Sequence, residues 1–139
     1  MPVSKPGSDR PYGKTAIERR LRTSLPLWTY DGTSIRRLYR TQGWKSTAMA
    51  FGAVAHLAET TWHHPDVAAS WDSLEVRLRT HAAKGVTDKD FALAALIEAA
   101  LQWRSDGVLE GTPDDPRFAH VKRDAPVAAA RPRRRGAAR

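Results

Sequence analysis

Residues 73–81, SLEVRLRTH, form the pattern that most restricts the fold of this chain. Leu74, Val76 and Leu78 alternate with polar or charged side chains, so an extended strand here has one apolar face and one charged face. Such strands are typical of an antiparallel sheet that is covered on one side and open to water on the other. The sequence therefore predicts a sheet of this kind, with residues 73–81 as its best-marked strand.

Three further segments complete the predicted sheet. Residues 27–31 (LWTYD) and 34–40 (SIRRLYR) are rich in strand-forming residues, and the Gly-Thr pair between them is typical of a turn. We therefore expect these two segments to form an antiparallel hairpin. Residues 67–71 (VAASW) are expected to form a weaker strand immediately before the best-marked one.

Two segments at opposite ends of this region are predicted helices. In residues 14–25 apolar side chains recur every fourth position, and a proline stops the pattern. Residues 86–103 begin with Thr87 as a candidate N-cap and carry Asp90 at the third helical position. A carboxylate at that position satisfies the helix start and its dipole, which by itself accounts for Asp90.

Residues 43–62 form the longest predicted helix, and Pro65 ends its pattern. Gly52 lowers the local helix propensity by about 1 kcal/mol relative to alanine, and we expect it to mark close packing against the sheet. Five residues follow a 3-4-3-4 spacing and are expected to form the apolar face of this helix: Ala48, Phe51, Ala55, Ala58 and Trp62.

The predicted order is helix, two strands, helix, two strands, helix. This order fits an α+β fold, in which helices pack on one face of a four-stranded antiparallel sheet. We expect one domain over residues 14–105. Residues 1–13 are expected to be a disordered tail, and residues 106–139 a C-terminal extension that ends in a basic disordered tail.

Charge and composition exclude several classes of protein. The net charge of +8 suggests a nucleic-acid-binding protein, but residues 26–103 carry eight basic and eight acidic side chains, so the excess lies at the two ends. The basic end, residues 131–139, has no interleaved aromatic residues that could stack on bases, so a nucleic-acid partner is not expected. The chain has no cysteine and no apolar run long enough to cross a membrane, and we expect a soluble, cytoplasmic protein.

The five histidines include an adjacent pair, His63 and His64, directly after the longest helix. His81 ends the best-marked strand, and ends of elements are where functional side chains collect on a rigid scaffold. These residues are consistent with an acid/base site, a metal site or a purely structural role. A metal site is disfavoured, because adjacent extended residues point in different directions and no HExxH-type motif is present. Glu59 alone fits a solvated helix residue.

Taken together, these residues resemble the pterin-4a-carbinolamine dehydratase family, enzymes that recycle tetrahydrobiopterin. The family pattern is an acid, three residues, His-His-Pro, an aromatic residue, nine residues, a histidine and a downstream aspartate. The matching residues here are Glu59, His63, His64, Pro65, Trp71, His81 and Asp90. Trp28 matches an early tryptophan of the family, and the resemblance spans about residues 17–101.

The resemblance implies dehydration of 4a-hydroxytetrahydrobiopterin to quinonoid dihydropterin, with no metal or redox cofactor. His63 and His81 are expected to carry the acid/base work, and Asp90 is expected to orient or charge a histidine. The residues expected to bind or surround the substrate are His64, Glu59, Pro65, Trp28 and Trp71. The implied partners are a pterin substrate, further copies of the chain in a homodimer or homotetramer, and the pathway of an aromatic amino acid hydroxylase.

Two departures from the family pattern leave its titrating groups in place. Trp44 stands near the usual Phe, and Trp71 stands where Tyr is most frequent. Some relatives have kept the fold and lost the activity, and serve as assembly factors for a carboxylase or as dimerisation cofactors for a transcription factor. The three histidines favour the enzyme, whereas the long charged tails favour this non-catalytic alternative. A third alternative is a nucleic-acid-associated protein that uses the arginine-rich tail.

Overall fold

The computed structural model describes residues 10–115, 117 and 119–124, and four strands in this part of the chain form one antiparallel sheet. The strands lie in the order β1-β2-β4-β3, with β1 at Thr29–Tyr30, β2 at Ile35–Arg40, β3 at Asp66–Ser70 and β4 at Ser73–Leu78. The helices are α1 (Lys14–Ser24), α2 (Trp44–Thr61), α3 (Asp88–Gln102) and a 3-10 turn, η1 (His81–Ala83). The predicted α+β architecture is therefore confirmed.

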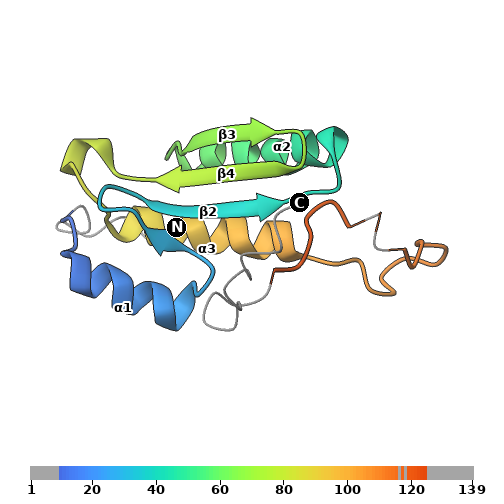
Figure 1. Ribbon diagram of the computed structural model, residues 1–139, viewed down its shortest axis with the longest axis horizontal. Coiled ribbons are helices and arrows are strands. Elements are labelled where there is room, and N and C mark those ends of the chain that lie inside the picture. The colour runs from blue at the N-terminus through green and yellow to red at the C-terminus, as the bar shows by residue number, and fades with distance from the viewer. Residues whose placement is uncertain (1–9, 116, 118, 125–139) are drawn as a thin grey trace, which may run out of the picture.

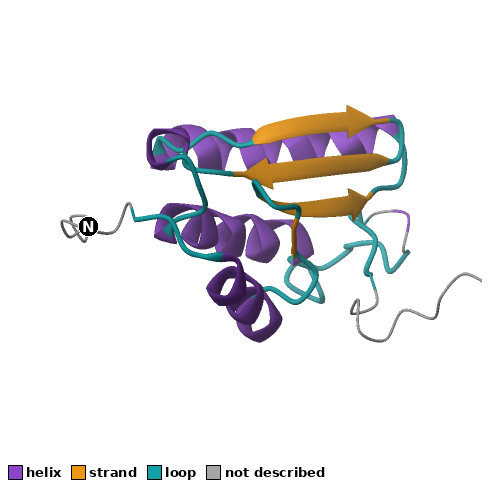
Figure 2. Ribbon diagram, turned by 60° about the vertical axis from the view of Figure 1, so that its left-hand side comes forward, coloured by secondary structure: helices purple, strands orange, loops and turns teal. Residues whose placement is uncertain are grey.

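The helices cover one face of the sheet and leave the other face open (Figures 1 and 2). α2 and α3 lie against this face, and α1 lies beside β1 near one edge. The alternation that suggested the sheet explains the arrangement, because Leu74, Val76 and Leu78 of β4 are fully buried. Ile35 and Tyr39 of β2 pair with Leu78 and Leu74 and are buried on the same face.

Two strands are shorter than the sequence pattern suggests. β1 has only two residues, and β4 stops at Leu78, so His81 begins a 3-10 turn and does not end a strand. The cause at β4 is local. Backbone hydrogen bonds between Thr80 and Gly85 close a loop, which turns the chain away from the sheet before α3 begins.

The predicted apolar face of α2 is wrong in all but one residue. Only Ala58 of the expected face is buried, whereas Phe51 is 45% exposed and Trp62, just after the helix, is 75% exposed. The residues of α2 that are buried are Ser46, Thr47, Ala50, Val54 and Ala58.

Hydrogen bonds allow the two polar residues of α2 to lie inside. The Thr47 hydroxyl donates to the backbone oxygens of Gly43 and Trp71 and pairs with the Thr41 hydroxyl at 2.6 Å.

The expected close packing of Gly52 against the sheet is also wrong, because a Cβ added there would meet no described atom within 4 Å.

The described C-terminal residues pack onto the domain. Val121 forms a bridge with Thr41 and is 3% exposed within the hydrophobic core, and Lys122 N–H donates to the Arg40 carbonyl. Asp124 pairs with the buried Arg37 at 2.8 Å. Residues 125–139, which hold most of the basic tail, and residues 1–9 lie outside the described part. In the described part no helix is long and apolar enough to cross a membrane.

Candidate active site

The end of α2 directs His63 toward α3. Trp62 adopts a left-handed conformation with φ of 53°, and its N–H donates to the carbonyls of Ala58 and Glu59. His63 N–H also donates to the Ala58 carbonyl, at 3.1 Å. This αL cap ends the helix abruptly and sends the next residue across to the start of α3.

His63 and Asp90 form the most buried polar pair of the histidine region. Nε2 of His63 lies 2.6 Å from Oδ1 of Asp90, and the two side chains are 15% and 0% exposed. No other hydrogen bond to the His63 ring is found among the described residues. The carboxylate therefore fixes the ring orientation through Nε2 and leaves Nδ1 available to a ligand.

Asp90 is held by the local structure that starts α3. Its second oxygen, Oδ2, accepts from the Thr87 N–H at 2.9 Å and from the Thr80 hydroxyl at 2.8 Å. Thr87 caps the helix, as the sequence predicts, and Thr87 and Asp90 form a reciprocal capping box. One buried carboxylate thus starts the helix and orients a histidine at the same time.

His64 has a more exposed environment than its neighbour. Its Nε2 lies 2.9 Å from Oε2 of Glu59, with side chains 51% and 68% exposed. The Trp62 ring stands edge-on to the His64 ring, with centroids 5.0 Å apart. An exposed pair of this kind is weak, so His64 and Glu59 can rearrange around a ligand at little cost.

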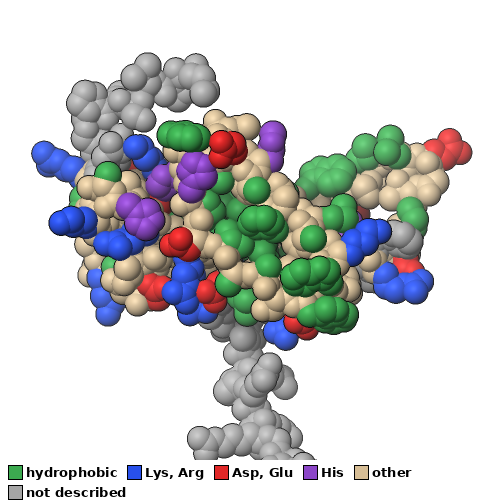
Figure 3. Space-filling model, turned by 90° about the horizontal axis from the view of Figure 1, so that it is seen from above, with side chains coloured by type: hydrophobic (Ala, Val, Ile, Leu, Met, Phe, Trp, Pro, Cys, Tyr) green, Lys and Arg blue, Asp and Glu red, His purple; other side chains and the backbone are tan. Residues whose placement is uncertain are grey.

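His81 lies on the loop between β4 and α3, next to the His63–Asp90 pair. It is exposed at the start of η1, and the residue before it, Thr80, donates to Asp90. Asp90 therefore connects the His63 ring to the loop that carries His81. Figure 3 shows histidine side chains gathered at one end of the face that α2 and β3 occupy, with hydrophobic side chains beside them.

The structure does not bring the two predicted pocket tryptophans to the histidines. Trp28 is 3% exposed, donates from Nε1 to Glu98 at 3.0 Å and packs edge-on to Tyr39. Trp71 is 68% exposed and lies against Gly43, beyond the far end of β3. The five residues of β3 lie between it and Pro65, and six residue steps of extended chain span roughly 20 Å. Pro65, partly buried, joins His64 to β3.

Sequence reasoning missed a partly buried charged cluster that lies farther along α3. Oε1 of Glu98 accepts from Trp28 Nε1, Arg37 Nε and the Tyr39 hydroxyl. Burial, together with the nearby Glu98 carboxylate, raises the pKa of Tyr39. The strand pattern held a signal, because Arg37 alternates in phase with Ile35 and Tyr39 and therefore had to face the core.

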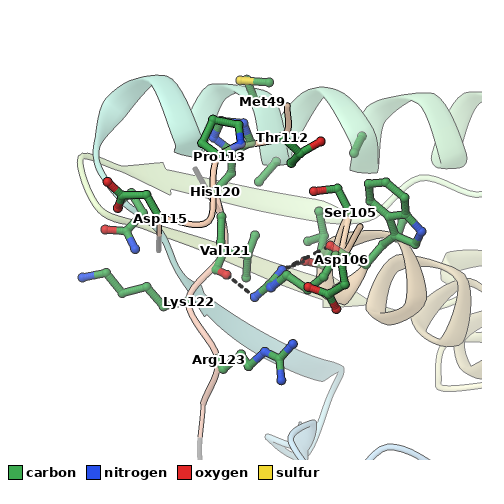
Figure 4. Close-up of a pocket in the computed structure, with 18 of the residues that line it drawn as sticks. Met49, Ser105, Asp106, Thr112, Pro113, Asp115, His120, Val121, Lys122 and Arg123 are labelled. Atoms are coloured by element: carbon green, nitrogen blue, oxygen red, sulfur yellow. Dashed lines mark hydrogen bonds between the residues drawn. The ribbon is translucent and has the colours of Figure 1, made fainter. Parts of the chain in front are cut away.

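A separate cavity of about 750 Å³ lies between α2, the end of α3 and the C-terminal extension (Figure 4). Met49 and Pro113 stand on one side of it, and the guanidinium of Arg104 donates to the Val121 carbonyl at 2.6 Å. None of the predicted site residues lines this cavity. In the described part of the chain, no three His, Cys, Asp or Glu side chains are grouped to hold a metal ion.

Comparisons with known proteins identify the family to which the chain belongs. The family model described as pterin 4 alpha carbinolamine dehydratase matches residues 10–100. A relative from Aquifex aeolicus, named "Putative pterin-4-alpha-carbinolamine dehydratase", is 36% identical over 89 residues, which cover 64% of this chain and 89% of the relative. A relative of the same name from Acidobacterium capsulatum is 44% identical over 87 residues, covering 62% and 92%.

A solved structure also resembles this chain. The crystal structure of a transcriptional coactivator/pterin dehydratase from Brucella melitensis superposes with a TM-score of 0.59 at 25% identity. The match covers 65% of this chain and 97% of that one. The family model, the sequence relatives and the shared fold lead to the same conclusion: the chain belongs to the pterin 4 alpha carbinolamine dehydratase family.

Proposed function

We propose that this protein is a hydro-lyase that dehydrates 4a-hydroxytetrahydrobiopterin to quinonoid dihydropterin by histidine acid/base catalysis. The observation that carries the proposal is the His63–Asp90 pair, 2.6 Å apart, beside the loop that bears His81. A carboxylate that fixes an imidazole in one orientation is the usual way to prepare a histidine for proton transfer.

The reaction breaks the bond between carbon 4a and its hydroxyl. One proton goes to the leaving hydroxyl, which departs as water, and one proton leaves the neighbouring ring nitrogen, whose electron pair forms the new double bond. His63 and His81 are assigned to these two transfers, because imidazole is the side chain best suited to give or take a proton at neutral pH. His64 and Glu59 are assigned to holding the pterin.

The test is a dehydration assay on the purified full-length chain and its histidine variants. Replacing His63 or His81 by Ala should lower the rate constant by about 10²–10⁴. His63→Gln is the matched control for folding, because its amide can still donate to Asp90 but cannot titrate. His64→Ala should instead weaken substrate binding more than it lowers the maximal rate.

The alternative function is that of a non-catalytic protein-binding factor. Two observations favour it. The name of the Brucella structure calls that protein a transcriptional coactivator as well as a pterin dehydratase, and the two ends of this chain are charged. In that case the wild-type protein would not exceed the buffer rate, and all histidine variants would match it. That result, with folding confirmed by circular dichroism, would exclude the dehydratase.

The proposal includes assembly into a homodimer or homotetramer. β3 is an edge strand, and among the described residues no other strand pairs with its outer side. α2 also presents exposed Trp44 and Phe51, at 58% and 45%. Exposed edges and apolar patches of this kind are usually covered by a partner.

A further inference from the structure

The loop between β4 and α3 carries His81 and is closed at its base. Thr80 N–H donates to the Gly85 carbonyl at 2.9 Å, and Gly85 N–H donates back to Thr80 at 3.4 Å. Within the loop, Lys84 adopts a left-handed conformation and its N–H donates to the His81 carbonyl. The inner side of the loop is held by the bond from Thr80 to Asp90.

The outer side of this loop is held by residues that precede α1. Tyr12 N–H donates to the Val86 carbonyl at 2.8 Å. Pro11 packs so closely on Gly85 that a Cβ at Gly85 would lie 2.8 Å from the Cβ of Pro11. Only glycine fits at position 85 without displacing Pro11. The contact between Pro11 and Gly85 is therefore a packed part of the fold.

The Tyr12 side chain fastens the same segment to the start of α3. Its hydroxyl donates to Oδ1 of Asp88 at 2.6 Å, and Arg20 of α1 donates to the same oxygen at 2.6 Å. The Tyr12 ring stands edge-on to Phe91 at 5.7 Å, and the Arg20 guanidinium lies 4.3 Å from the Phe91 ring centroid.

We propose that Pro11 and Tyr12 form a strap that positions the His81 loop against the His63–Asp90 pair, which makes Tyr12 a positioning residue for the acid/base site. The inference rests on the proposed dehydratase function. The loop is held between two anchors, Asp90 inside and the strap outside, so losing the outer anchor frees His81 while His63 stays bonded to Asp90. A displacement of about 1 Å is enough to reduce proton transfer strongly.

The first experiment measures the loop without reference to activity. Amide hydrogen exchange is followed in the full-length chain for Tyr12→Ala and Tyr12→Phe, with Tyr30→Phe as the matched control. Tyr30 also donates a hydroxyl hydrogen bond, to the Gly32 carbonyl, far from this loop in the sequence. Exchange at Thr80 and Lys84 should rise at least about tenfold in Tyr12→Ala, less in Tyr12→Phe, and not at all in the control.

The second experiment asks whether Tyr12 acts through His81. Tyr12→Ala should lower the dehydration rate constant about tenfold in the wild-type background, and should have no further effect in a His81→Ala background. An equal loss in both backgrounds would overturn the inference, as would unchanged exchange at Thr80 and Lys84. If the wild-type protein proves inactive, the proposed function fails, while the exchange measurement still decides whether the strap holds the loop.

Discussion

At the scale of single residues, Asp90 is a buried carboxylate that needs several hydrogen-bond donors. It is fully buried, and its two oxygens accept from donors on three elements: His63 after α2, Thr80 after β4 and Thr87 at the start of α3. A buried carboxylate is tolerated only when its hydrogen-bonding capacity is filled. The charge of Asp90 therefore both holds the region together and selects the orientation of the His63 ring.

Replacing Asp90 by Asn should separate these two contributions. Both oxygens of Asp90 accept hydrogen bonds, but the Asn side chain has an NH₂ group in place of one oxygen. That NH₂ group would face a hydrogen-bond donor, so one bond is lost. We expect the free energy of unfolding to fall by about 1–3 kcal/mol and the dehydration rate constant by about 10²–10⁴. Urea unfolding and the dehydration assay measure the two effects. Asp72→Asn, at an exposed turn, is the control, and a similar loss there would contradict the assignment.

The sequence predicts the position of Asp90 at the start of α3 but not the surroundings of Trp28, for a physical reason. The spacing of Thr87 and Asp90 is a local signal, because both residues satisfy the same helix start. The surroundings of Trp28 depend on Glu98 and Tyr39, which are distant in the sequence and meet it only in the fold. No local sequence pattern shows whether the indole of a tryptophan faces a ligand or a partly buried carboxylate such as Glu98.

At the scale of elements, the start of α3 is joined to the N-terminal strap through Asp88. Hydrogen bonds from Tyr12 and Arg20 hold the pKa of the Asp88 carboxyl below its usual value. A carboxylate with a lowered folded-state pKa stabilises the protein above its unfolded pKa, and this contribution is lost as the pH falls through the folded pKa. The side chain is 45% exposed, so the contribution is modest.

The Asp88→Asn variant should reveal this contribution as a pH-dependent difference in Tm. At pH 7 the variant should melt below the wild type, because the amide cannot replace the charge-assisted bonds. Below about pH 4 the difference should shrink as wild-type Asp88 becomes protonated. Asp106→Asn, an exposed aspartate of the C-terminal extension, should show no such trend. A difference in Tm that stays constant from pH 7 to pH 2 would contradict this account.

The wrong prediction for α2 shows that the spacing of apolar residues does not determine which face of a helix is buried. Counting apolar residues favours the row that contains Phe51, whereas the fold buries the row that contains Thr47 and Val54. Thr47 can lie inside only because Thr41, Gly43 and Trp71 bond its hydroxyl, and two of these partners, Thr41 and Trp71, lie outside α2 and its N-cap. The existence and length of a helix follow from local sequence, whereas its buried face depends on the surface it meets.

At the scale of the whole molecule, the domain continues to Asp124, well beyond the residues that match the family. Val121 lies in the core. Arg37 is 3% exposed and forms two ion pairs, one with Asp124 and one with Glu98. Removing Asp124 leaves the buried guanidinium with Glu98 as its one remaining carboxylate partner among the described residues, and this loss is unfavourable in the interior. The C-terminal extension therefore contributes to the stability of the domain as far as Asp124.

Two truncations should test how far along the C-terminus this contribution extends. Deleting residues 125–139 should leave the Tm and the dehydration rate unchanged. Deleting residues 119–139 removes Val121 and Asp124 and should lower the Tm by at least about 10 °C. Equal melting temperatures for the two truncated proteins would show that the extension is dispensable, and a large loss in the shorter deletion would show that the basic tail is structural.

The exposed row of α2 is suited to contact with a second copy of the same chain. Trp44 and Phe51 lie on one stripe of the helix, and Gly52 borders this stripe with open space above it. An antiparallel contact between two α2 helices about Gly52 would place the apolar stripes of the two copies together, which is the self-complementarity that a two-fold interface requires.

Replacing Phe51 by Glu should weaken this self-association without unfolding the protomer, because Phe51 is 45% exposed and lies outside the core. Each copy loses a buried aromatic side chain worth about 1.5–3 kcal/mol, and a two-fold interface loses it twice, so the dissociation constant should rise at least about 100-fold. Sedimentation at micromolar concentration measures the change, and circular dichroism checks the fold. Leu96→Glu, on α3 at a matched exposure of 46%, should leave the assembly intact. A wild-type protein that sediments as a monomer, or equal dissociation in both variants, would contradict an interface through α2.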